Sequence, residues 1–197
     1  MEVYNFKNKK KAIEFISHFV INEIKTNPSI VLGLSTGNTM KPFYKSLLTI
    51  ARKEKISFSK ISTFNLDEYY DMDISDKLTL RYYMDKHFFN KIDINKNNIH
   101  FLNGKTNNVK KECKKFENES KSVGGIDVMI LGIGRNAHIG FNEPGSPQFS
   151  VTRKVKLSKS TINANFPNKK NKKNNYALTI GINTILKSKI LVLIGLG

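Results

Sequence analysis

The stretch IDVMILGIGRNAHIGFNEPGSP, residues 126–147, contains the pattern that decides the fold. Its first part, residues 126–134, is mostly apolar and predicts a buried strand. A glycine-rich turn follows. An imidazole, His138, and a carboxylate, Glu143, then stand on a segment that has neither a helical nor a strand period. The stretch therefore predicts a strand whose end leads into a loop that carries an acid–base pair.

The segments around this stretch alternate between the periods of strands and helices. Apolar runs predict strands at 30–34, 61–66 and 190–195, and helical stripes occur at 9–26, 42–48, 80–88 and 108–120. Strands that alternate with helices indicate a parallel sheet, and strands that are apolar throughout indicate that both of its faces are covered. The sequence predicts an α/β fold with a doubly wound, mostly parallel sheet and helices on both faces. The length fits a single domain over 1–197.

Ligands of such sheets bind at the carboxyl ends of the strands, where three polar segments should meet. One is STGNT, which comprises Ser35, Thr36, Gly37, Asn38 and Thr39 and leads into a helix. Its backbone N–H groups and hydroxyls could bind an anion. The alternative is that Asn38 or Thr39 simply caps the helix.

The second segment is Asp67-Glu68, and the third is the loop that carries His138 and Glu143. Two acids at a strand end fit either a solvated end, a cap for the next helix, or a functional role. A metal site would need three or more ligands, and no second His or Cys lies near His138 in the sequence. With the metal site disfavoured, the remaining interpretation is a site with a carboxylate base, a His proton shuttle and an anion-binding loop. It suits isomerisation or elimination on a sugar phosphate without a cofactor.

The overall composition indicates which kinds of partner and which cellular compartment to expect. The net charge is +17, which fits either a polyanion-binding protein or a lysine-biased surface. Arginines number only four, the lysines are scattered, and aromatic residues do not interleave with them, so the second interpretation is favoured and no nucleic-acid partner is expected. The single cysteine, Cys113, and the lack of a signal peptide or a long apolar run predict a cytoplasmic protein without a membrane partner.

Five segments resemble the glucosamine-6-phosphate deaminase family, which is also called glucosamine-6-phosphate isomerase. They are LGLSTGNT (32–39), FNLDEYY (64–70), IHFLNGKT (99–106), GIGRNAHIGFNEPGSP (132–147) and YALTIGINTILKSKILVLI (176–194). The resemblance covers almost the whole chain. The related sugar lactonases lack the His-Ile-x-Phe-Asn-Glu-Pro run, so the match is specific to the deaminases.

The resemblance implies a modified Rossmann-like sheet and a cofactor-free enzyme of amino-sugar catabolism. The family converts glucosamine 6-phosphate and water to fructose 6-phosphate and ammonia. By matching position, Asp67 is the base that moves a proton between C2 and C1, and His138 opens the pyranose ring. Asn136 and Glu143 hold and tune that histidine, and the segment 35–39 binds the phosphate. Whether the chain forms a homo-oligomer stays open.

Some positions depart from the family pattern. Asn136 stands where some members have Asp, Asn38 where a second glycine is usual, and Val151 where Arg is common. The segment 161–167 is shorter than in the family and lacks a phosphate-binding Arg.

The chain also stops at Gly197, whereas family members continue through a phosphate-contacting Lys, a helix and a strand. We therefore expect a C-terminally truncated sheet and a weakened phosphate site. Either Lys169, Lys170, Lys172 or Lys173 replaces the missing cations, or the chain is a homologue that binds sugar phosphates with little or no turnover.

Overall fold

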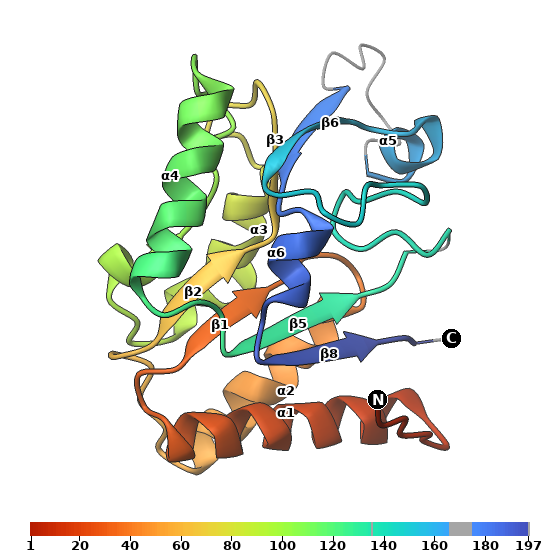
Figure 1. Cartoon of the computed structure of the whole chain (residues 1–197). Coiled ribbons are helices and arrows are strands. Elements are labelled where there is room, and N and C mark those ends of the chain that lie inside the picture. Colours follow the sequence, from red (N-terminus) through yellow and green to blue (C-terminus); the bar gives the residue numbers. More distant parts are fainter. Residues whose placement is uncertain (135, 166–174, 197) are drawn as a thin grey trace.

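The structure is a computed structural model that describes residues 1–134, 136–165 and 175–196. Its centre is a parallel sheet with the strand order β4-β2-β1-β5-β8 (Figure 1). These strands are β1 (Val31–Leu34), β2 (Ser62–Asn65), β4 (Ile99–His100), β5 (Val128–Gly132) and β8 (Ile190–Ile194). The predicted parallel α/β sheet is confirmed.

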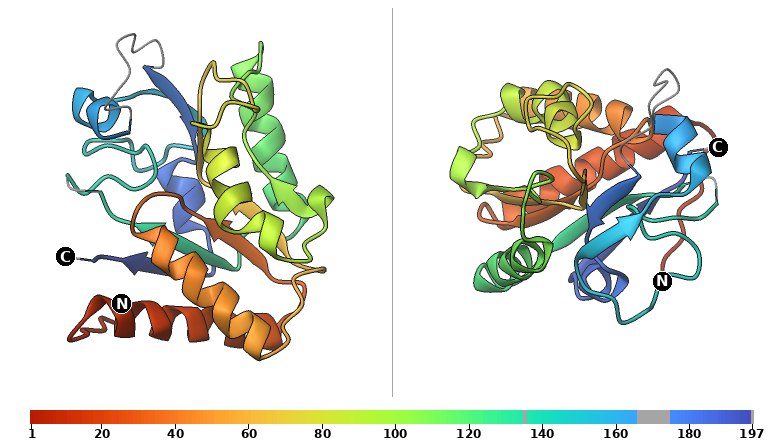
Figure 2. Two further views of the ribbon diagram at one scale, coloured as in Figure 1. Left: turned by 180° about the vertical axis from the view of Figure 1, so that it is seen from behind. Right: turned by 90° about the horizontal axis from the view of Figure 1, so that it is seen from above.

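Helices cover both faces of this sheet, which confirms the doubly wound prediction. On one face lie α1 (Lys9–Thr26) and α2 (Met40–Lys53), with α3 (Leu80–His87) packed beside α2. On the other face lie α4 (Val109–Ser122) and α6 (Ile182–Leu186) (Figures 1 and 2). Side chains alternate along each strand: Val128 and Ile130 of β5 join the core under α1 and α2, while Met129 and Leu131 join the core under α4 and α6.

A second, smaller sheet is antiparallel and is not predicted by the sequence pattern. It has the order β3-β7-β6 and consists of β3 (Asp67–Tyr69), β7 (Tyr176–Thr179) and β6 (Arg153–Lys156). The expectation that Asp67-Glu68 closes the preceding strand is therefore wrong. The chain changes sheets at Leu66, which donates its N–H to Leu34 O at 3.1 Å and accepts from Ile180 N at 2.8 Å.

Short helical elements complete the described fold. They are the helix α5 (Lys159–Asn165) and the 3-10 turns η1 (Phe89–Lys91) and η2 (Lys96–Asn98).

The predicted helix 9–26 is confirmed by α1. Its first turn is capped by Asn8, whose side chain accepts from Lys11 N at 3.0 Å. The predicted loop 169–175 falls, apart from Asn175, outside the described residues. No helix in the described ranges is long and apolar enough to cross a membrane.

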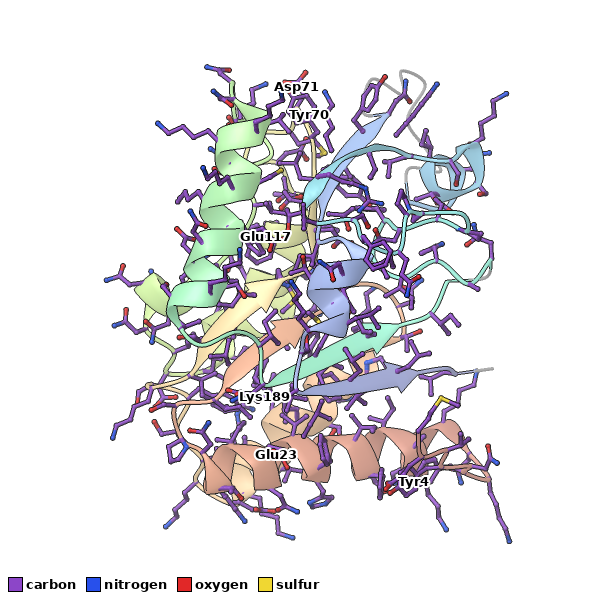
Figure 3. All side chains as sticks on the ribbon, in the orientation of Figure 1. Tyr4, Glu23, Tyr70, Asp71, Glu117 and Lys189 are labelled. Atoms are coloured by element: carbon purple, nitrogen blue, oxygen red, sulfur yellow. The ribbon has the colours of Figure 1, made fainter. Side chains whose placement is uncertain are left out.

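One carboxylate joins the two layers. Glu117 projects from α4 on the side of α6 (Figure 3), and its Oε1 accepts hydrogen bonds from Thr152 N at 2.9 Å, Thr152 Oγ1 at 2.6 Å and Thr184 Oγ1 at 2.7 Å. Thr152 directly precedes β6 and Thr184 lies on α6. This contact fixes the small sheet relative to the central one, beside the edge where the candidate site lies.

Candidate active site

The three polar segments predicted at the carboxyl edge do meet there. Segment 35–39 follows β1, Asp67 follows β2 by two residues, and the loop 133–147 follows β5. The loop approaches Asp67 at Gly140, where a Cβ atom would lie only 3.3 Å from Asp67 Oδ2 and 3.2 Å from Thr179 Oγ1. The backbone of the histidine loop therefore packs directly against the Asp67 carboxylate.

Strand β7 and the residues after it hold this loop in place. Phe141 N donates to Thr179 Oγ1 at 3.2 Å, and Asn142 Nδ2 donates to Ile180 O at 2.8 Å and to Ile139 O at 3.0 Å. Thr179 is also the registered antiparallel partner of Asp67. The same residue thus positions both the loop and the aspartate.

A chain of hydrogen bonds runs from His138 through Asn136 to Glu143. His138 Nδ1 lies 2.6 Å from Asn136 Oδ1, and Asn136 Nδ2 donates to Glu143 Oε2. Because a carboxylate only accepts, the amide must turn its NH₂ group to Glu143 and its oxygen to the ring. His138 Nδ1 therefore carries the proton, and Nε2 is left as the basic nitrogen that can take a proton from a ligand.

Glu143 is held as a carboxylate. Partial burial tends to raise its pKa. Hydrogen bonds from Thr161, whose Oγ1 donates at 2.8 Å, from Asn136 and from Ser158 outweigh that effect and lower the pKa below its usual range. Its negative charge lies behind the amide of Asn136. It can therefore stabilise a positive charge on His138 although Asn136 itself is neutral.

The turn that carries His138 depends on a glycine. Gly134 N donates to His138 O at 2.9 Å, and a Cβ at Gly134 would lie 2.2–2.4 Å from three atoms of the His138 ring. The ring thus lies flat against the bare backbone of Gly134. Ala137 completes the turn with φ of 64°, a conformation that costs a non-glycine residue roughly 1 kcal/mol.

Asp67 is a buried carboxyl group that no described residue stabilises by a hydrogen bond. The residue is 6% exposed. Burial, with a smaller contribution from the charge of Glu68, raises its pKa to about 8. A base of this strength populates both protonation states near neutral pH, which suits a group that must take and return a proton.

The neighbouring Glu68 has a different role. Its Oε1 accepts from Tyr69 N at 2.8 Å and Leu80 N at 2.9 Å, and its Oε2 accepts from Arg81 N at 2.8 Å. Burial raises its pKa, and these backbone hydrogen bonds counteract part of the rise. The helix-cap interpretation is therefore confirmed for Glu68, which caps α3, whereas Asp67 makes no such contact.

Segment 35–39 presents backbone groups rather than hydroxyls. Ser35 Oγ is buried and donates to Ile130 O at 2.6 Å, and Thr39, the N-cap residue of α2, makes no side-chain capping bond. The capping alternative is thus wrong for Thr39. Within the described residues, no hydrogen bond engages the N–H groups of residues 36–39, which remain free to bind an anion beside the α2 N-terminus.

Two contacts fix the shape of this segment. Tyr44 OH donates to Ser35 O at 2.6 Å, and Tyr83 OH donates to Gly37 O at 2.7 Å. Gly37 has φ of 106°, a value that favours glycine, whereas Asn38 lies outside the positive-φ region. The replacement of the usual second glycine by Asn38 therefore introduces no backbone strain.

Sequence reasoning identified Asp67, Asn136, His138 and Glu143 but missed the groups that position them. Gly134, Gly140, Thr161 and Thr179 act through contacts that only the folded chain creates, and the sequence carries no signal for them. The candidate replacements Lys169, Lys170, Lys172 and Lys173 lie outside the described residues. In the described ranges, no three His, Cys, Asp or Glu side chains gather into a set that could hold a metal ion.

Sequence comparison identifies the relatives of this chain. A family model described as glucosamine-6-phosphate isomerases/6-phosphogluconolactonase matches residues 7–197. Glucosamine-6-phosphate deaminase 1 of Giardia intestinalis is 44% identical over 185 residues, which are 92% of this chain and 70% of that protein. The glucosamine-6-phosphate deaminase of Clostridium acetobutylicum is 40% identical over 199 residues, with 100% of this chain and 83% of that protein covered.

Comparison with solved structures gives the same picture. A monomeric glucosamine-6-phosphate deaminase superposes with a TM-score of 0.93 at 36% identity, over 98% of this chain and 81% of that one. A 6-phosphogluconolactonase from Thermotoga maritima superposes with a TM-score of 0.75 at 18% identity, over 98% and 81% of the two chains. The second match shows a common fold alone.

Proposed function

This chain belongs to the family of glucosamine-6-phosphate isomerases and 6-phosphogluconolactonases, and we propose that it is a glucosamine-6-phosphate deaminase. The reaction converts glucosamine 6-phosphate and water to fructose 6-phosphate and ammonia. Relatives that carry the deaminase name are 40–44% identical to this chain. Under this proposal the chain acts in amino-sugar catabolism in the cytoplasm, and the reaction requires no cofactor.

The observation that carries the proposal is the packing of the histidine loop on Asp67. The site contains two groups that can transfer protons, Asp67 and the Nε2 of His138. The two groups differ in burial and in hydrogen-bond partners. Asp67 is buried with its pKa raised to about 8, while His138 is partly exposed and backed by Asn136 and Glu143. A deaminase needs both groups, because ring opening and enolisation are separate proton transfers.

In the first step His138 opens the sugar ring. Its Nε2 takes the proton of the C1 hydroxyl while the C1–O5 bond breaks, and the proton is delivered to O5. The transient imidazolium keeps its Nδ1 proton on Asn136 Oδ1, with the Glu143 carboxylate beyond it. The product of this step is the open-chain aldehyde.

In the second step Asp67 isomerises the open chain. Its carboxylate removes the proton from C2 while the ammonium group on C2 gives up a proton and O1 gains one, so that an enolamine forms, and the proton held by Asp67 then returns at C1. The resulting C2 imine is hydrolysed by water, which releases ammonia and leaves the ketone of fructose 6-phosphate. The sugar phosphate is held by the free N–H groups of residues 36–39 at the α2 N-terminus.

The test is a product assay on the purified chain. With glucosamine 6-phosphate, ammonia and fructose 6-phosphate should appear in equal amounts. With 6-phosphogluconolactone, the rate of acid release should not exceed that of the uncatalysed hydrolysis. Acid release from the lactone without ammonia from the amino sugar would instead assign the chain to the lactonase branch, and no reaction with either substrate would also contradict the proposal.

A further inference from the structure

A cationic groove lies outside the candidate active site, between α2 and the end of α3. Its volume is about 550 Å³. Helix α2 contributes Lys41, Lys45, Leu48 and Arg52, which recur at the spacing of one helical face, and the far wall is formed by His87 and Lys91. Concave sites of this volume commonly hold small molecules.

The charge of the groove is uncompensated. It has four Lys or Arg side chains in its wall and no Asp or Glu. In the described part of the chain, none of these four cations takes part in an ion pair. The groove therefore carries a concentrated positive charge that nothing within the described structure neutralises.

Acidic side chains on the adjoining elements are engaged elsewhere. Asp85 of α3 pairs with Arg81 at 3.0 Å, and Glu54, at the end of α2, pairs with Lys25 of α1 at 2.6 Å. Asp93, beyond η1, accepts from Ser57 Oγ and Phe58 N. Each of these carboxylates is thus bound to a residue that does not line the groove.

The arrangement is electrostatically unfavourable in the free chain. Lys41 lies in the first turn of α2, where the helix dipole disfavours a cation and where the helix has no acidic residue. Lys45 follows at the i,i+4 position, where like charges repel. On the opposite wall, burial and then the charges of Lys41, Lys91 and Lys86 lower the pKa of His87.

We propose that this groove is a binding site for a small anion that carries two or more phosphate groups. Three lysines and one arginine surround the groove. This number of cations suits a ligand with several phosphate groups better than a ligand with a single phosphate. Leu48 and the ring of His87 add apolar surface for a ligand body. A nucleic acid would need an extended basic stripe with aromatic stacking positions, whereas the described groove is a local patch with no Tyr, Phe or Trp in its lining.

The groove adjoins the candidate active site without being part of it. His87 packs on Tyr83 with the ring centroids 4.6 Å apart, and Tyr83 OH donates to Gly37 O. The proposal does not depend on the deaminase assignment, because binding to the groove can be measured without turnover.

Calorimetric titration with inorganic triphosphate tests the proposal. The chain offers a matched pair of double variants. Lys41→Gln with Lys45→Gln changes the second and sixth residues of α2, and Lys110→Gln with Lys114→Gln changes the same positions of α4, far from the groove. Both remove two exposed charges at i,i+4 spacing. The groove variant should raise the Kd of triphosphate by on the order of tenfold or more, and the α4 variant by less than about twofold.

Two further measurements distinguish lost binding from unfolding and from binding at the candidate active site. The groove variant should melt at the same or a higher temperature than the unaltered chain without ligand, since it relieves repulsion, so lost binding cannot reflect unfolding. Glucosamine 6-phosphate should not displace triphosphate. Equal losses in both variants, no binding by the unaltered chain, tighter binding of a random DNA duplex than of triphosphate, or displacement by the sugar phosphate would each overturn the proposal.

Discussion

At the scale of single residues, Asp67 and Glu68 show how neighbouring carboxyl groups acquire different chemistry. Both are buried, but three backbone N–H groups bind Glu68, whereas in the described ranges none binds the Asp67 carboxyl group. A carboxylate without donors in a buried place keeps its proton to a higher pH. Among the described residues, the lack of hydrogen-bond donors to its carboxyl group therefore suits Asp67 to the proton transfer that we propose for it.

The raised pKa of Asp67 predicts how stability depends on pH. Between its ordinary pKa of 3.8 and its folded pKa of about 8, the folded chain holds a proton that the unfolded chain has released. The stability that this bound proton gives to the folded chain is fully present below the unfolded pKa. It is lost as the pH rises toward about 8. Asp67→Asn removes the linkage, so the variant should become more stable than the unaltered chain as the pH rises.

Urea unfolding of both proteins measures this effect. Relative to about pH 5, the advantage of Asp67→Asn at about pH 8.5 should grow by roughly 4 kcal/mol, at about 1.4 kcal/mol per pH unit. A difference in the free energy of unfolding that is the same at both pH values would contradict the raised pKa.

Asn136 connects His138 to Glu143, and its removal should affect the reaction more than the fold. Asn136→Ala breaks both hydrogen bonds on an exposed turn, so the free energy of unfolding should fall by less than about 1 kcal/mol. The kcat should fall by on the order of 10- to 100-fold, with KM little changed, because the ring loses its tautomer and its orientation. Steady-state kinetics and urea unfolding separate the two effects. A kcat within about twofold of the unaltered value would remove Asn136 from the mechanism.

At the scale of elements, two glycines with opposite surroundings lie at the end of β5: Gly132 is its last residue, and Gly134 lies in the turn that follows. A Cβ at Gly134 would collide with the His138 ring, whereas at Gly132 it would meet nothing within 4 Å. The turn is therefore built around the ring, and Gly132 supplies a matched control.

Gly134→Ala should displace His138 and lower kcat/KM by at least about tenfold, in line with the cost of misplacing a catalytic group. Gly132→Ala should leave kcat/KM within about twofold. Circular dichroism spectra and melting temperatures of both variants check that the fold is kept. Similar kinetics for the two variants would show that the ring does not need the bare backbone of Gly134.

At the scale of the whole molecule, the central sheet could be predicted because its strands are apolar and alternate with amphipathic helices. The second sheet could not. Its strand β3 is three residues long, and β6, RKVK, carries charged residues that resemble a loop. Both strands are held by antiparallel pairing with β7, which lies far from β3 in the sequence and is separated from β6 by α5, so no local pattern indicates the sheet.

The candidate site divides in the same way. His138 and Glu143 stand out because they occupy a loop at the end of an apolar strand. The packing of Gly140 on Asp67 and the anchoring of the loop on Thr179 depend on long-range register, which sequence pattern does not define. The sequence thus indicates the groups that we propose to react, and the fold determines how they are held.

The central claim is that Asp67 moves the proton between C2 and C1 of the sugar. The most direct measurement is solvent exchange: fructose 6-phosphate and ammonia are incubated with the enzyme in deuterium oxide, and deuterium at C1 and C2 of the recovered sugars is measured by NMR. The unaltered chain should introduce deuterium. Asp67→Asn should introduce none, although it stays folded.

Glu68→Gln is the control for this measurement, because it changes the adjacent acid. It should lose about 1–3 kcal/mol of stability through the weakened cap of α3 but retain exchange per folded molecule. Deuterium incorporation at the unaltered rate in Asp67→Asn, or its loss in Glu68→Gln alone, would contradict the assignment of Asp67 as the base.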